Sequence, residues 1–172
     1  MTLYSFMKRF SNILLFLTIL LLITQNSCKE NETFPVIPHI EYLGFMKLQT
    51  QAGIDSLGIL RFSFTDGDGD LGYPSGSANP QYDLFISYFE LNNGVLVPYI
   101  TPSGDTIQFN ARLPYLTPDI ANKTIKGEIE DTLSINNPVS DNDTILFRIY
   151  ITDRAGNQSN TIETPLINII KR

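Results

Sequence analysis

The residues with the greatest chemical potential lie in one short stretch, Asp66-Gly67-Asp68-Gly69-Asp70-Leu71-Gly72. Three carboxylates occupy every second position, and the intervening glycines permit a tight loop in which the side chains can converge. Convergence alone is unfavourable, because two like charges about 4 Å apart repel by roughly 1 kcal/mol in water and about 4 kcal/mol at an effective dielectric near 20. A bound cation removes this repulsion, so the stretch predicts a cation site.

The ligand chemistry indicates which cation the loop would hold. Ca²⁺ accepts about 6–8 oxygens in flexible geometry, whereas Mg²⁺ needs a strict octahedron and zinc prefers nitrogen and sulfur. The loop therefore predicts Ca²⁺, but it is not an EF-hand: Leu71 occupies the position that requires glycine, and Ser77 replaces the bidentate glutamate. The alternative interpretation is an acidic, solvated loop between two strands with no ion.

Three carboxylates do not complete a calcium coordination sphere, so further ligands are expected from other loops. Asp83 opens the next expected strand, and Asp153 and Asn157 flank the turn Asp153-Arg154-Ala155-Gly156-Asn157. Strand pairing can bring these loops together. The predicted metal ligands are Asp66, Asp68, Asp70, Asp83, Asp153 and Asn157.

Few residues support an enzymatic function. The single histidine, His39, follows Pro38 at the start of the first expected strand, where a capping or exposed imidazole is simpler than a general base. Glu128 and Glu130 lie two apart in another expected strand and share a face, which indicates solvent-facing carboxylates rather than a glycosidase pair. The sequence therefore predicts no catalytic residues.

Binding of a sugar is a separate hypothesis, because pyranose faces stack on exposed aromatic rings. Tryptophan is absent, and most tyrosines and phenylalanines lie in alternating strands where packing explains them. Tyr73, Tyr99 and Tyr115, which lie near turns and prolines, are the candidate ligand-binding residues. They predict, as an alternative function, a glycan-binding accessory protein of a polysaccharide-uptake system.

The elements that position these residues have the two-residue period of β-strands. Leu60, Phe62 and Phe64 alternate with polar residues, and apolar residues repeat in the same way from 145 to 151. Further strands are expected at 39–49, 82–91, 95–100, 107–112, 125–135 and 160–170, with a hairpin turn at Asn92-Asn93-Gly94. Seven or eight short strands predict an all-β fold, a single immunoglobulin-like antiparallel β-sandwich; a closed barrel is the alternative.

The N-terminus predicts a secretion signal. Lys8 and Arg9 precede an apolar run at 13–23. This run has the length of a signal-peptide core, about 7–15 residues, rather than the 20 or so of a membrane span. An uncleaved helix beginning near Leu3 is the alternative. The predicted organisation is a helical signal peptide at 1–27, a tether at 28–38 and the sandwich at 39–172.

Cys28, the only cysteine, directly follows Ser27 at the end of this signal. The position resembles the lipobox of bacterial lipoproteins, although Gln25 and Asn26 depart from its usual aliphatic and small residues. Acylation gives durable anchoring, since each buried methylene contributes roughly 0.8 kcal/mol and two or more chains suffice. We therefore expect lipidation at Cys28 and a membrane partner, and no disulfide within the folded domain.

The charge balance argues against nucleic acid as a partner. The formal net charge is −6, and loss of Lys8 and Arg9 with the signal makes the mature chain two units more negative. Nucleic-acid binding depends on clustered lysine and arginine that neutralise phosphates.

Several segments together resemble a known group of proteins. They are 64–72, with its aspartate loop, 82–86, 126–129 and 151–160, and the likeness of which they are the clearest parts extends over nearly the whole mature chain. They are similar to surface lipoproteins of the Bacteroidetes type with an Ig-like domain, a group from which no catalytic residue can be transferred. The resemblance implies a lipid-anchored, surface-exposed sandwich at the outer membrane. We expect a non-enzymatic binding or structural module with a protein or glycan partner at the cell surface.

Overall fold

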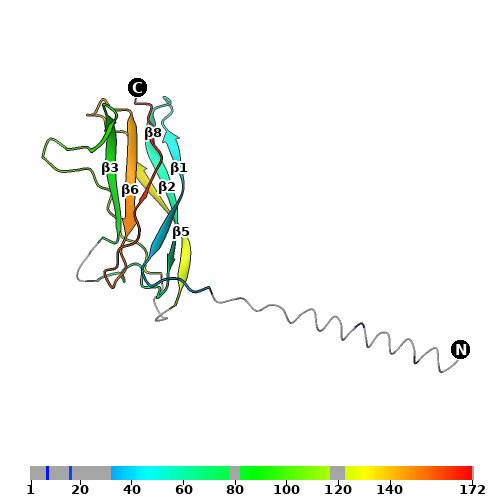
Figure 1. The fold of residues 1–172 in the computed structure, drawn as a ribbon. Coiled ribbons are helices and arrows are strands. Elements are labelled where there is room, and N and C mark those ends of the chain that lie inside the picture. The colour runs from blue at the N-terminus through cyan, green and yellow to red at the C-terminus, as the bar shows by residue number, and fades with distance from the viewer. Residues whose placement is uncertain (1–6, 8–15, 17–31, 78–81, 117–122, 172) are drawn as a thin grey trace. The chain divides into compact units, whose positions relative to one another are not determined.

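The computed structural model describes Met7, Phe16 and residues 32–77, 82–116 and 123–171 (Figure 1). The chain divides into two units, Met1–Glu32 and Thr33–Arg172, and every strand of the described residues lies in the second. Met7 and Phe16 are helical, whereas the rest of the predicted signal peptide and Cys28 lie outside the described residues. Among the residues that are described, no helix is long and apolar enough to cross a membrane.

Eight strands are present in the described part of the second unit. They are β1 (His39–Gln49), β2 (Asp55–Asp66), β3 (Leu84–Asn92), β4 (Val95–Pro98), β5 (Ile125–Ser134), β6 (Thr144–Ile151), β7 (Ile162–Glu163) and β8 (Ile167–Asn168). The unit begins at Thr33, so the last part of the predicted tether packs with the domain.

The strands form two antiparallel sheets. One sheet has the order β1-β2-β5, and the other has the order β4-β3-β6-β7, with β8 pairing the opposite half of β6. The sheets lie face to face (Figure 1). Because β2 lies between β1 and β5 while β6 lies between β3 and β7, the connectivity is that of an immunoglobulin-like sandwich. The predicted fold class is confirmed.

The core lies between the sheets and follows the predicted alternation. Leu60, Phe62 and Phe64 of β2 point inward, as do the alternate isoleucines of β6. Phe147 lies at the centre of an aromatic cluster, with ring centroids 5.7 Å from Phe45, 5.7 Å from Tyr88 and 5.9 Å from Phe109. Packing of this kind contributes stability beyond area burial, which matters in a domain without a disulfide.

The hairpin between β3 and β4 confirms the predicted turn. Asn92 pairs with Val95, so the loop contains only Asn93 and Gly94. Both have positive φ angles, 50° and 80°, as a type I′ turn requires.

Two expected strands differ in the structure. Segment 107–112 runs beside β3 but forms only isolated bridges, Ser87 with Gln108 and Leu84 with Ala111. The main-chain N–H groups of Asp83 and Leu84 both donate to the Ala111 oxygen, so the ladder is irregular there.

The second difference is at 160–170, which is divided into β7 and β8. Pro165 lies between the two strands and cannot donate a ladder hydrogen bond. Thr164 replaces the regular pairing: its N–H donates to the Phe147 oxygen at 3.0 Å, and its hydroxyl accepts from the Phe147 N–H at 3.1 Å.

Candidate metal centre

Asp66 is the last residue of β2 and continues the inward phase of Phe62 and Phe64. Its side chain is therefore directed into the sandwich and is fully buried. The chain then turns back on itself, because the Asp70 N–H donates to Asp66 Oδ2 at 2.9 Å. The strand period and the loop that follows it together place a carboxylate at the end of the core.

Three carboxylates converge in this loop. One oxygen from each of Asp66, Asp68 and Asp70 lies within 4.8 Å of the others. Two ligands of one Ca²⁺ are separated by up to about 5 Å, twice a bond of 2.3–2.6 Å. This group can hold a metal ion.

The hydrogen bonding of the carboxylates is incomplete. Asp66 Oδ2 accepts the bond from Asp70, and Asp70 Oδ2 accepts the Ala155 N–H at 3.1 Å. The Oδ1 atoms of Asp66, Asp68 and Asp70 are buried, and while the carboxylates are ionised they have no donor among the described residues. Buried polar atoms without partners are rare in folded proteins and indicate a missing ligand, water or proton.

Asp55, at the other end of β2, shows how this protein satisfies a buried carboxylate. It is also fully buried, and it accepts hydrogen bonds from Lys47 Nζ at 2.6 Å, Gln49 Nε2 at 2.9 Å and the Ile170 N–H at 2.9 Å. Burial alone would raise the pKa of Asp55, but these bonds and the lysine charge lower it overall. At the Asp66 end, the charges that act on the buried carboxylate are those of two other aspartates, Asp68 and Asp70.

The electrostatics of the loop reflect this difference. Burial, a hydrogen bond shared with Asp68 and the charges of Asp68 and Asp70 raise the pKa of Asp66 to about 7. Burial and the charges of Asp153 and Asp68 also raise the pKa of Asp70, although Arg154 acts in the opposite direction. Two species can relieve the repulsion: a proton shared between Asp66 and Asp68, or a cation bound by all three carboxylates.

Arg154 supports the loop from the neighbouring turn, a role that the sequence analysis did not identify. Its side-chain Nη1 donates to the main-chain oxygens of Leu71 at 3.1 Å and Gly72 at 2.7 Å. Its main-chain N–H donates to the main-chain oxygen of Asp70 at 3.2 Å. The guanidinium also lies 5.0 Å from the centroid of the Tyr115 ring. In the sequence, only its position between the predicted ligands Asp153 and Asn157 indicates that Arg154 lies near the loop.

The other predicted ligands are not part of the three-aspartate group. Asp83 is fully buried; Oδ1 accepts the Leu113 N–H, and Oδ2 has no hydrogen-bond partner in the described part of the chain. Asp153 is close enough to Asp70 to affect its pKa, but its two oxygens accept bonds from the Asn157 N–H and Nδ2, each at 2.7 Å. These residues therefore shape the surrounding turns, and their role as ligands stays a prediction.

The three candidate tyrosines occupy different environments. Tyr73 lies under Arg112, with 5.9 Å between the guanidinium carbon and the ring centroid, whereas Tyr115 lies under Arg154. Tyr99 packs against the hydrophobic core. One face of two rings is thus next to a guanidinium group, and sugar binding by these tyrosines stays a prediction from the sequence.

The residues considered for catalysis lie on the surface. His39 is 3.7 Å from Glu41, and both side chains are more than half exposed. Glu128 and Glu130 bind the same partner, Arg61, each at 2.9 Å. This arrangement is an exposed cross-strand ion-pair network.

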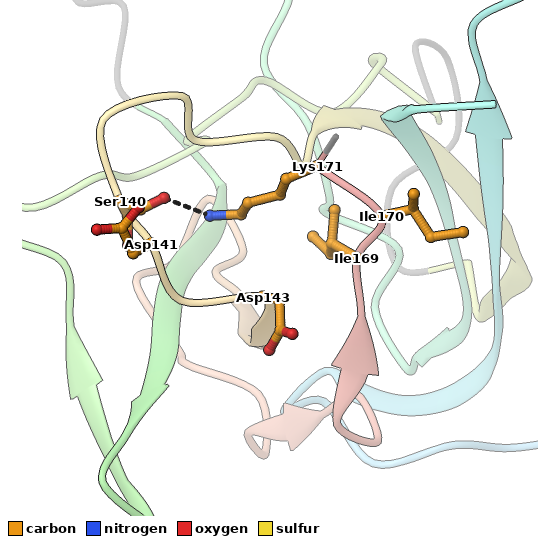
Figure 2. Close-up of a pocket in the computed structure, with 6 residues that line it drawn as sticks. All are labelled: Ser140, Asp141, Asp143, Ile169, Ile170 and Lys171. Carbon is orange, nitrogen blue, oxygen red and sulfur yellow. Dashed lines mark hydrogen bonds between the residues drawn. The ribbon is translucent and has the colours of Figure 1, made fainter. Parts of the chain in front are cut away.

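A shallow cleft of about 370 Å³ is formed by residues 140–143 and the C-terminal segment 169–171 (Figure 2). Lys171 crosses it, and Nζ donates to the main-chain oxygens of Ser140 at 3.0 Å and Asn137 at 3.2 Å. Because main-chain oxygens already bind the lysine, this cleft has less ligand chemistry to offer than the aspartate loop.

The fold and the three-aspartate group define the class of protein. It is an antiparallel β-sandwich in which three carboxylates converge at the end of β2. No family model, curated protein or solved structure matches the chain.

Proposed function

We propose that this protein is an outer-membrane lipoprotein that acts as a non-enzymatic binding or structural module, and that its sandwich is stabilised by Ca²⁺ at Asp66, Asp68 and Asp70. One observation carries the calcium proposal. Asp66 is fully buried with an oxygen that lacks a donor among the described residues, and two further carboxylates converge on it. A divalent cation supplies the positive charge that Lys47 supplies to Asp55.

The chemistry of the group favours Ca²⁺ over other metals. The available atoms are carboxylate oxygens, which zinc does not select. Mg²⁺ dehydrates reluctantly and keeps several waters, whereas Ca²⁺ accepts many protein oxygens in irregular geometry. The buried oxygens of this loop suit the ion that sheds its water more readily.

The position of the loop supports a structural role for the ion. Residues 66–72 are hydrogen-bonded to three other segments: the Gly67 N–H to the Pro35 oxygen at 2.8 Å, Thr124 Oγ1 to the Gly67 oxygen at 3.0 Å, and Arg154 to the loop carbonyls. An ion here would fix the loop at the end of β2 to which Arg154, in the turn that follows β6, is hydrogen-bonded. The consequence is a stiffer sandwich without a disulfide.

Calorimetric titration of the mature protein with CaCl₂ tests this proposal. We expect one site, with affinity reduced at least about tenfold, or 1.4 kcal/mol, in Asp68→Asn. Asp68 is the best position to change, because Asp66 and Asp70 also accept main-chain hydrogen bonds. Asp105→Asn, in an exposed turn, is the matched control and should bind like wild type. Absence of binding heat in wild type at several temperatures would refute the proposal.

The lipid anchor is tested by Cys28→Ala in cells. We expect wild type to fractionate with membranes and to incorporate labelled palmitate, and the variant to lose the label and become soluble, because the acyl chains supply the membrane affinity. Ser27→Ala keeps a small residue before the cysteine and should behave like wild type. Equal membrane association and processing of Cys28→Ala would contradict lipidation.

A further inference from the structure

Residues 33–38, here named the docking segment, directly precede β1 in the sequence and pack on the domain. Phe34 is half-buried and Pro38 is buried, whereas Val36 and Ile37 are more than half exposed. The segment forms no strand, and its two prolines remove main-chain donors. Its attachment therefore depends on donors and on a fitting surface that the rest of the domain supplies.

That surface is the aspartate loop. The Gly67 N–H donates to the Pro35 oxygen at 2.8 Å. The approach is so close that a Cβ on Gly67 would lie 2.2 Å from the Phe34 oxygen and 2.6 Å from the Pro35 oxygen. The docking segment thus contacts the one residue that separates Asp66 from Asp68.

The position of Gly67 is set by the two carboxylates beside it. A cation bound by Asp66, Asp68 and Asp70 would restrain the backbone between these ligands, including Gly67, whose N–H donates to Pro35. When the cation is removed, the three charges repel and the buried Asp66 oxygen needs another partner. A displacement of Gly67 by either change would remove the hydrogen bond to Pro35 and the close approach to the Phe34 oxygen.

We propose that Ca²⁺ occupancy of the aspartate loop controls whether the docking segment is bound to the sandwich. This inference rests on the proposed calcium site and adds a consequence for the anchored protein. Cys28 lies just before the docking segment in sequence. Release of six residues adds up to about 20 Å of extended chain, at roughly 3.3–3.6 Å per residue. Calcium thereby sets how far the sandwich can move from its anchor.

Amide exchange of the ¹⁵N-labelled mature lipoprotein in detergent micelles tests the coupling, with Ca²⁺ as the only ligand. We expect the Gly67 amide to exchange at least tenfold more slowly with Ca²⁺ than with chelator. The Gly104 amide, which donates to the Thr101 oxygen at 2.9 Å in a turn elsewhere, is the matched control and should change less than twofold.

A nitroxide on Val36→Cys provides a second readout at an exposed position of the docking segment. Its mobility should increase when Ca²⁺ is chelated. Gly67→Ala places a methyl group against the Phe34 and Pro35 oxygens but keeps all three carboxylates. Because the coupling is reciprocal, this variant should bind Ca²⁺ more weakly than wild type but still saturate in calorimetry, with the nitroxide mobile in both conditions.

The outcomes separate the inference from the function on which it rests. Slower Gly67 exchange and an immobilised nitroxide with Ca²⁺ support the coupling. Calcium binding by calorimetry with unchanged exchange and mobility overturns the coupling and leaves the calcium site intact. Absence of calcium binding overturns both.

Discussion

Saturating Ca²⁺ is expected to raise the melting temperature of the mature protein by about 10 °C relative to chelator. An ion present at about 100 times its Kd stabilises the folded state by roughly 2.7 kcal/mol. For a domain of this size, each kcal/mol corresponds to about 3–5 °C. Thermal unfolding followed by circular dichroism, with Ca²⁺ or with EDTA, measures the effect, and equal melting temperatures in the two conditions would contradict it.

Asp68→Asn distinguishes a metal site from general stabilisation by salt. The variant should lose most of the calcium response, because one ligand charge is gone. In chelator it should be at least as stable as wild type, because the repulsion with Asp66 and Asp70 is reduced. Asp105→Asn should keep the full response. A variant that is destabilised equally with and without Ca²⁺ would indicate a purely structural aspartate.

The calcium response should also depend on pH in a defined direction. Without metal, the folded-state pKa of Asp66 is raised to about 7 by burial, by Asp68 and by the neighbouring charges, against about 3.9 in the unfolded chain. The folded state then binds more protons, so stability in chelator falls as pH rises from about 4 to about 7. Ca²⁺ needs the ionised carboxylates, and the rise in melting temperature should grow over the same interval.

The second large effect is expected from Glu90→Ala, which should reduce the free energy of unfolding by about 3–5 kcal/mol. Glu90 is 1% exposed. Its carboxylate accepts hydrogen bonds from four side chains: Tyr88 Oη at 2.9 Å, Asn137 Nδ2 at 3.0 Å, Ser140 Oγ, and Asn142 Nδ2 at 2.9 Å. Removing the acceptor leaves up to four donors without a partner in or near the core, each at a cost of about 1–3 kcal/mol before relaxation. Urea unfolding measures the loss.

Glu163→Ala is the matched control for Glu90→Ala. Glu163 also binds a polar partner, with 2.7 Å between Oε1 and Arg148 Nη2, but both side chains are nearly half exposed. Exposed ion pairs contribute about 0–1 kcal/mol, so the variant should remain close to wild type. Similar losses in the two variants would contradict the importance of the buried network.

Glu90 should also make the protein sensitive to acid. Burial alone would raise the pKa of Glu90, but the hydrogen bonds from Ser140, Asn142, Tyr88 and Asn137 lower it overall. A carboxylate with a lowered folded-state pKa stabilises the protein above its unfolded value, and this contribution is lost as pH falls through the folded value. The direction is opposite to that of Asp66 in chelator, so Glu90→Ala should flatten only the acid side of the stability profile.

Much of the fold follows from local patterns. A period of two identifies strands and their inward faces wherever one side is buried, as in β2 and β6, and Asn93-Gly94 specifies a tight hairpin because its residues tolerate positive φ. The pattern overestimated segments 107–112 and 160–170, because strand continuity depends on a neighbouring partner as well as on alternation. Asp66 could be assigned to the core by the same period, since it continues the phase of Phe64.

The sequence by itself determined the strands, the sandwich and the three aspartates that can share a cation, because these depend on residues close together in the chain. Only the tertiary structure decided which buried carboxylate oxygens receive a hydrogen bond. Asp55 receives a donor from Ile170, 115 residues away, whereas Asp66 Oδ1 receives none within the described residues. It also decided that Asp83 lies outside the group and that Arg154 and Pro35 hold the loop. Such partners are set by how the two sheets pack, and no local spacing encodes them.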